Sequence, residues 1–355
     1  MSTIEHYGVL FPTSVVGSMP RPDSVCELLG NNDPKATEAM DRAVSEVIAM
    51  QEETGLDMVS DGEWRRASYI GVITELADGF QVGSNPTDGR PWTTVVGKLE
   101  PKAPGFIAAE ARFLKQTTNK RTKVTMPAPA LLGERMWDPE RSRKAYPTRE
   151  SFVEALVPIL KRELELVCAE GVDLVQIDDP HLCLFVDPEV RRQSKNADEE
   201  ADFSVEANNT LTEGIAAARL AVHLCRRAGA RARGEVCHAG SYEAILPQIN
   251  RLKVDHMTME FATPSAGALH VLSGLREDLE IGLGCVSVEP GKIDSRDAIV
   301  ARVEQALEVL SADRVVLNPD CGFAPGSAAK VDSEEVFQKL KEMVAAAEIL
   351  RDRYA

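Results

Sequence analysis

Short apolar runs alternate with longer amphipathic segments along most of this 355-residue chain. The short runs are rich in Val, Ile and Leu and are bounded by turn-forming residues, which is typical of buried strands. In the longer segments apolar residues recur at helical spacing, as at Met40, Val44 and Val47. Strands are predicted at residues 15–16, 56–60, 121–126, 172–178, 233–238, 256–260, 280–284 and 314–318. Helices are predicted at residues 33–54, 149–170, 205–229, 242–252, 266–275, 295–310 and 333–353.

Strands that are mostly followed by helices, over this length, predict an α/β fold. We expect one (β/α)8 TIM barrel that forms a single domain over residues 1–355. Residues 80–119 interrupt the alternation between the second and third strands. They combine the turn sequence Gly-Ser-Asn-Pro-Thr-Asp-Gly-Arg-Pro with alternating apolar and polar residues, which predicts a β-hairpin excursion.

The charge balance narrows the range of partners. A net charge of −16 argues against nucleic acid or an anionic membrane surface, because both attract a positive face. No apolar run reaches the roughly 20 residues that a membrane span needs. The first residues show no signal-peptide pattern, so a cytoplasmic protein is expected.

The seven cysteines are an odd number and are scattered along the chain, which predicts free thiols in a reducing compartment. Cys168 and Cys225 fall in segments predicted to be helical. We expect both to pack as small apolar side chains.

Polar and thiol residues gather where the predicted strands end: Ser18, Asp61, Glu63, Asp178, Glu235, Cys237, Glu260, Glu289 and Cys321. In a TIM barrel such positions meet at one face. Two thiolates with one or two carboxylates suit zinc, which predicts a divided metal site made of Glu235, Cys237, Glu260 and Cys321. A zinc ion held in this way lowers the pKa of an incoming thiol.

Taken singly, these segments also have plainer interpretations. Gly17 and Ser18 fit an ordinary turn, and the acids and arginines of residues 61–66 fit a surface ion-pair cluster. Asp179 precedes a proline and fits a cap on the following turn.

Five short motifs, in order across nearly the whole chain, resemble the catalytic domain of cobalamin-independent methionine synthase. They are Val-Gly-Ser-Met-Pro at 16–20, Asp-Gly-Glu at 61–63, Gln-Ile-Asp-Asp-Pro at 176–180, Glu-Val-Cys at 235–237 and Asn-Pro-Asp-Cys-Gly at 318–322. The last motif is the most specific. The resemblance implies a barrel of the uroporphyrinogen-decarboxylase-like superfamily with a zinc ion that activates a thiol for alkylation.

The resemblance also implies residue roles. The family's His-x-Cys ligand pair falls on residues 235–237, its glutamate ligand on Glu260 and its last cysteine ligand on Cys321. The implied substrate-binding residues are Val16, Gly17, Ser18, Asp61, Glu63 and Asp178. Of these, the loop 16–18 would meet the substrate carboxylate, and Glu63 and Asp178 would hold the homocysteine amine. Asp178 and Glu289 are the implied catalytic residues.

Two positions depart from the family pattern. Glu235 stands where the family has a histidine ligand, and Glu289 stands where methionine synthases have a histidine that handles protons. His238 is an alternative ligand. It is less favoured than Glu235 because neighbours on a strand face opposite sides.

The sequence therefore predicts a zinc-dependent methyltransferase that acts on a small thiol such as homocysteine. The methyl donor is either a folate or a corrinoid protein, because the family's amino-terminal, folate-binding half is not expected here, and a homo-oligomer is left open. The alternatives are an alkyltransferase like epoxyalkane:coenzyme M transferase, a metal-free decarboxylase or lyase that uses Asp61, Asp178 and Arg65 or Arg66, and a zinc-binding protein without catalysis.

Overall fold

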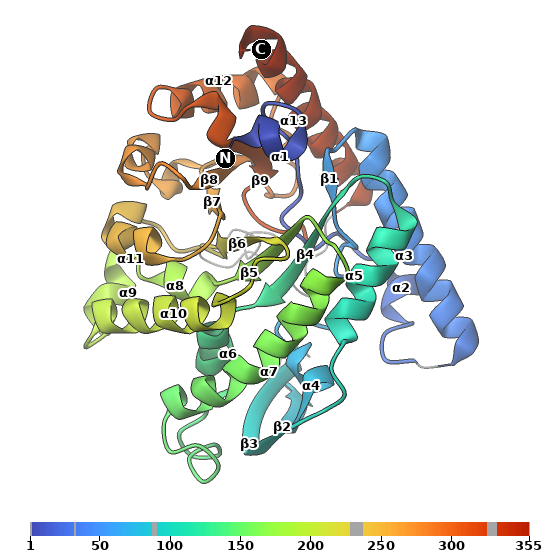
Figure 1. Cartoon of the computed structure of the whole chain (residues 1–355), viewed down its shortest axis with the longest axis vertical. Helices are drawn as coiled ribbons and strands as arrows, with labels where there is room; N and C mark the ends of the chain where they lie inside the picture. The colour runs from blue at the N-terminus through green and yellow to red at the C-terminus, as the bar shows by residue number, and fades with distance from the viewer. Residues whose placement is uncertain (1, 32, 87–90, 228–236, 325–331, 355) are drawn as a thin grey trace.

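The computed structural model describes residues 2–31, 33–86, 91–227, 237–324 and 332–354. Its centre is a curled seven-stranded parallel sheet in the order β1-β4-β5-β6-β7-β8-β9, with the longer helices arranged outside it (Figure 1). A separate two-stranded sheet pairs β2 with β3. The predicted α/β class is confirmed.

The strands are β1 Met58–Val59, β2 Ala77–Ser84, β3 Pro91–Pro101, β4 Arg121–Pro127, β5 Leu174–Asp178, β6 Arg219–Leu224, β7 His256–Glu260, β8 Glu280–Val286 and β9 Val315–Pro319. The α-helices are α1 Thr3–Tyr7, α2 Asp23–Cys26, α3 Pro34–Thr54, α4 Ile73–Leu76, α5 Phe106–Thr117, α6 Pro129–Met136, α7 Arg149–Ala169, α8 Pro180–Leu184, α9 Pro188–Gln193, α10 Ala197–Thr212, α11 Leu246–Arg251, α12 Arg296–Leu307 and α13 Ser333–Tyr354. Short 3-10 helices are η2 Tyr242–Ile245, η3 Pro264–Ala266, η4 Leu269–Gly274 and η5 Ala312–Arg314.

The parallel strands are short and apolar because both of their faces are covered. Every residue of β5, β7, β8 and β9 is buried, as expected for a sheet with helices outside and side chains inside. Since neighbouring strands run parallel, their carboxyl ends lie at one edge of the sheet. This edge collects the residues of the site.

Residues 12–14 connect the two outer strands of the sheet. Thr13 forms a single parallel bridge with Leu317 of β9, and Ser14 forms one with Met58 of β1. The regular strand predicted at residues 15–16 is not formed, because pairing is limited to these two bridges. A fully regular eight-stranded barrel therefore stays a prediction.

The helix predicted at residues 205–229 is confirmed only as far as Thr212 and is wrong beyond it. α10 ends at Thr212, Gly214 follows with a left-handed φ of 80°, and residues 219–224 form strand β6 in the middle of the sheet. The alanines of residues 216–218 and 221 favoured a helix in the sequence, but burial between β5 and β7 selects a strand. Most of the strand predicted at 233–238 lies outside the described residues.

The predicted hairpin excursion is confirmed in β2 and β3, whereas residues 106–117 of the segment predicted at 80–119 form helix α5. β2 and β3 pair antiparallel between β1 and β4 in the chain, and they project from the central sheet beside α7 (Figure 1). The hydroxyl of Ser142 donates to the carbonyl of Val95 at 2.6 Å, and the Tyr146 hydroxyl accepts from the Leu99 amide at 2.8 Å. The segment before α7 thus fixes the hairpin to the helical layer.

In the described parts of the chain, no helix is long and apolar enough to cross a membrane.

Candidate metal centre and its surroundings

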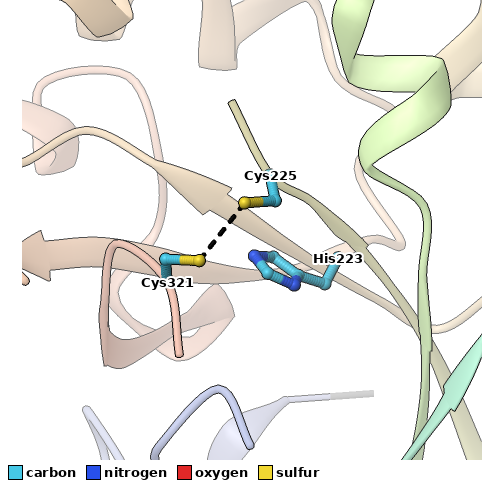
Figure 2. Close-up of side chains that lie close together, drawn as sticks. All are labelled: His223, Cys225 and Cys321. Atoms are coloured by element: carbon cyan, nitrogen blue, oxygen red, sulfur yellow. Dashed lines mark hydrogen bonds between the residues drawn. The ribbon is translucent and has the colours of Figure 1, made fainter. Parts of the chain in front are cut away.

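A group of potential metal ligands, with His223 and Cys321 buried and Cys225 partly buried, lies at the carboxyl edge of the sheet. Ligand atoms of His223, Cys225 and Cys321 all lie within 4.8 Å of one another. The two sulfurs are 3.2 Å apart, and the imidazole of His223 lies beside them (Figure 2). These residues come from β6 and from the segment that follows β9, so the fold assembles the group from distant parts of the sequence.

The local structure of β6 explains how two of these residues face the same point. Side chains two residues apart along an extended chain point to the same side. His223 is the penultimate residue of β6 and Cys225 follows the strand directly, so both point inward and Leu224 points away from them. Cys321 comes two residues after β9 ends.

The imidazole of His223 is held in one orientation by a carboxylate. Its Nδ1 lies 2.9 Å from Oδ1 of Asp178, which is its register partner on β5. Its Nε2 is buried and has no hydrogen-bond partner among the described residues. A carboxylate on one nitrogen and an open second nitrogen is the usual arrangement of a metal-binding histidine.

Glu260, at the end of β7, is the fourth potential ligand. Its Oε1 accepts from the backbone amide of Arg226 at 2.7 Å, and its carboxyl group is also hydrogen-bonded to Cys225. Burial, reinforced by Asp320, raises the pKa of Glu260 to about 8. The hydrogen bond with Cys321, together with burial, holds the pKa of Cys225 well above its usual range.

This donor set fits zinc. One imidazole nitrogen, two sulfurs and one carboxylate correspond to the ligand types of four-coordinate zinc sites. A divalent cation at this position would offset the burial that now disfavours the ionised forms of the Cys225 thiol and the Glu260 carboxylate. The orphaned Nε2 of His223 supplies the observation that is hardest to explain without a metal.

The ligand pair predicted at residues 235–237 stays a prediction, and the described residues offer a different pair at 223–225. Cys237 is not a member of the group formed by the described residues, and its sulfur instead donates to the carbonyl of Arg227 at 3.4 Å. Glu235 lies outside the described residues. The alternative ligand His238 has its Nδ1 3.1 Å from Asp187. The group at 223–225 was not considered in the sequence, because residues 219–224 were interpreted as helix and Cys225 as a packing residue.

The segment 16–18 lies against the chain around Cys321. The Ser18 carbonyl accepts from the Phe323 amide at 3.0 Å, and its hydroxyl accepts from the Ala324 amide at 3.4 Å. A Cβ on Gly322 would come within 2.2 Å of the Ser18 hydroxyl, so only glycine allows this approach. Ser18 therefore lies beside the segment of the candidate ligand Cys321, and its part in substrate binding stays a prediction.

Glu63 and Asp61 form a buried acidic pair after β1. Oδ1 of Asp61 accepts from the Glu63 amide at 3.0 Å, and Oε1 of Glu63 accepts from the Thr125 hydroxyl at 2.6 Å. Burial is the main cause that raises the pKa of Glu63 to about 7, and Asp178 and Asp61 add to it. A Cβ on Gly17 would come within 2.8 Å of the Glu63 carboxylate. The segment 16–18 thus lies against the acidic pair, and the surface-cluster interpretation of these acids does not hold because both are buried.

The neighbouring arginines are bound to other acids. Arg66 is buried and pairs with Glu110 at 2.7 Å, and Arg65 pairs with Asp41 at 2.6 Å. A decarboxylase-like site would need a cation to bind an acidic substrate. Both candidate cations, Arg65 and Arg66, are already paired with acids of the chain. Asp179 is a cap as well, since it accepts from the Leu182 amide at 2.9 Å.

Glu289 lies after β8 and is about half exposed, with its carboxylate 3.8 Å from Lys292. Its other interactions within the described chain involve Ser287 and Lys339, and neither belongs to the site. A part in proton handling stays a prediction.

Three site residues escaped the sequence prediction: His223, Cys225 and Tyr69. The first two carry a signal, because His-Leu-Cys has the spacing of a ligand pair on a strand. Tyr69 carries none. Burial raises its pKa, and Cys225, Asp178 and Cys321 act on it electrostatically, which places it near the metal group.

Fold and site together define an α/β enzyme whose imidazole and thiols meet buried carboxylates at the carboxyl edge of a parallel sheet. The chain belongs to the family described as cobalamin-independent synthase, catalytic domain, whose model matches residues 11–349. It is thereby a methyltransferase of the methionine synthase-like class. The resemblance inferred from the sequence motifs is confirmed.

Individual relatives agree with this family. The chain is 26% identical to a methionine synthase from Saccharolobus solfataricus over 360 residues, covering 97% of this chain and 96% of that protein. It is 26% identical to a methionine synthase from Pyrococcus horikoshii over 352 residues, covering 96% of this chain and 93% of that protein. In fold it resembles a B12-independent methionine synthase from a Shewanella species in complex with selenomethionine, with a TM-score of 0.80 and 22% identity over 97% of this chain and 98% of that one.

Proposed function

We propose that the protein transfers a methyl group to the thiol of homocysteine in a zinc-dependent reaction. The observation that carries this proposal is the group of His223, Cys225 and Cys321, whose ligand atoms lie within 4.8 Å of one another. The relatives named methionine synthase support the product, because methionine is homocysteine with a methyl group on its sulfur.

The proposed zinc ligands are Nε2 of His223, the sulfurs of Cys225 and Cys321, and the carboxylate of Glu260. Zinc in this site would lower the pKa of the incoming thiol so that the thiolate is the nucleophile near neutral pH. Asp178 fixes the imidazole through Nδ1, and the Arg226 amide fixes Glu260. The chain's own part is therefore to hold the ligands in place before the thiol arrives.

The substrate's charged groups have matching partners next to the ligands. Glu63, Asp61 and Asp178 are proposed to hold the ammonium group, because their buried carboxylates gain most from a cation. The loop 16–18 and the Ser18 hydroxyl are proposed to hold the substrate carboxylate. Contact between this loop, Glu63 and the Cys321 segment supports a single pocket for both ends of an amino acid.

The test combines metal analysis with a donor comparison. Protein purified without chelator is assayed for zinc and for methionine formation from homocysteine, with either 5-methyltetrahydrofolate or methylcobalamin as donor. About one zinc per chain and methionine formation with the folate support the proposal. Methionine formation with methylcobalamin but not with the folate would show that the methyl donor is a corrinoid and not a folate. Methionine formation that survives complete removal of zinc would sink the zinc-dependent mechanism.

A further inference from the structure

Gln176 is a fully buried amide on the inner side of the sheet, below the proposed site. It lies two residues before Asp178 on β5, so both side chains point the same way. Its Nε2 donates to Oδ1 of Asp178 at 2.8 Å and to the backbone carbonyl of Val16 at 3.0 Å. One NH2 group therefore spans the partner of the metal-ligand histidine and the proposed substrate loop.

The oxygen of the Gln176 amide is also fixed by hydrogen bonds. Oε1 of Gln176 accepts from Nζ of Lys123 at 3.3 Å and from the Thr258 hydroxyl at 3.2 Å. Because Lys123 and Thr258 donate while the Val16 carbonyl and the Asp178 carboxylate accept, the amide has a single orientation. All four possible contacts of its oxygen and nitrogen are made, in a buried setting where each is costly to lose.

Lys123 strengthens the same connection. It is fully buried, and its Nζ also donates to the backbone carbonyl of Val15 at 2.7 Å. Two successive carbonyls, of Val15 next to the loop and of Val16 in it, are thus held by donors from inside the sheet. The loop cannot shift without breaking contacts that also position Asp178.

We propose that Gln176 is a positioning residue that couples the proposed substrate loop at residues 16–18 to the Asp178–His223 pair. It does not touch zinc or substrate. It acts by setting the place of the Asp178 carboxylate, and through it the imidazole, while it anchors the loop. The substrate part of this inference rests on the proposed function, whereas the coupling between loop and imidazole rests on the hydrogen bonds alone.

The decisive variant is Gln176→Glu. It keeps the size and both acceptor contacts, but it loses the donors and sets a carboxylate against Asp178. We expect at least a tenfold loss of zinc affinity, in the range seen when residues behind metal ligands are changed. We also expect an altered absorption spectrum of the Co(II)-substituted protein and a higher KM for homocysteine. Gln338→Glu, the same change at an exposed position of α13, should alter none of these.

Gln176→Met provides a second, uncharged variant in case a buried glutamate prevents folding. Hydrogen exchange of the metal-free protein then gives a readout that needs neither zinc nor turnover. Faster exchange is expected both in residues 12–19 and around residues 223–225. Faster exchange at only one of the two ends, or a changed KM with an unchanged Co(II) spectrum, would overturn the coupling.

These outcomes separate the two proposals. Linked exchange changes in a protein that makes no methionine would leave the coupling intact and refute the proposed function. If the wild type makes methionine but the variants show faster exchange at only one of the two segments, the proposed function stands and the coupling is refuted.

Discussion

Asp178 and His223 are register partners on the adjacent strands β5 and β6, and their Oδ1 and Nδ1 atoms lie 2.9 Å apart. The pairing explains why the imidazole presents Nε2 to the two sulfurs. It also gives Asp178 two proposed tasks, since the same carboxylate faces the substrate's ammonium group. A change at Asp178 should therefore affect metal and substrate together.

Asp178→Asn should weaken zinc binding by about 10–100-fold, because the amide is a poorer acceptor for the imidazole N–H than the carboxylate. Competition with a chromophoric chelator measures this. The Asp187–His238 pair, with 3.1 Å between the atoms, offers a control outside the site. Asp187→Asn should leave zinc affinity unchanged. Equal zinc affinity in wild type and Asp178→Asn would contradict the assigned role.

Cys225→Ser and Cys237→Ser should differ in metal content. Cys225→Ser removes a sulfur that lies 3.2 Å from the sulfur of Cys321. The thiol of Cys237 instead donates a hydrogen bond to the Arg227 carbonyl. Cys225→Ser should lose nearly all zinc and fall at least 100-fold in activity, in line with losing one of four ligands. Cys237→Ser should keep about one zinc per chain in elemental analysis. The opposite result would restore the ligand pair first predicted from the sequence.

The free energy of unfolding should fall with rising pH because of Glu63. Burial raises its folded pKa from 4.5 to about 7, so the folded state binds the proton more tightly than the unfolded state. The contribution is complete below pH 4.5 and is lost as pH rises through about 7, with an upper limit of about 3 kcal/mol. Urea unfolding of wild type and Glu63→Gln at pH 5, 6, 7 and 8 tests this. A difference between the two proteins that does not vary with pH would refute it.

Glu163→Ala should destabilise the fold by about 2–4 kcal/mol. The buried carboxylate accepts from the amides of Gly105 at 2.6 Å, Ile107 at 2.6 Å and Ala108 at 3.1 Å, at the start of α5. Its loss leaves these amides without their acceptor. Glu165 lies at an exposed position of α7, the helix that also carries Glu163. Glu165→Ala should therefore stay within about 0.5 kcal/mol of wild type. Chemical denaturation compares the two, and similar effects would exclude the capping role.

Much of the architecture could be predicted because strands and helices of this chain differ clearly in periodicity. α3 begins after Asp33, whose side chain accepts from the Lys35 amide, and ends before Gly55 with a φ of 94°. Both signals are local and visible in the sequence. The hairpin was predictable for the same reason, since its turn residues separate two alternating runs.

The failure at residues 205–229 had a different origin. Leu-Ala-Val-His-Leu-Cys fits either a helix or a strand by composition, and only burial between β5 and β7 decides in favour of the strand. This error hid the candidate pair at 223–225, and the sequence pointed only to the pair at 235–237. Glu260 and Cys321 were visible as candidates because Glu260 ends a short strand and Cys321 follows one, and neither strand resembles a helix. The place of Tyr69 near the candidate ligands could not be predicted, because the residues around it show neither helix nor strand periodicity.

The proposed ligands also occur in a definite order along the chain. His223 and Cys225 come first, Glu260 next, and Cys321 only near the carboxyl end. During synthesis on the ribosome, a nascent chain that has emerged as far as Glu260 offers three donors and lacks the fourth. Stable capture of the ion must then wait until the final strand has been translated.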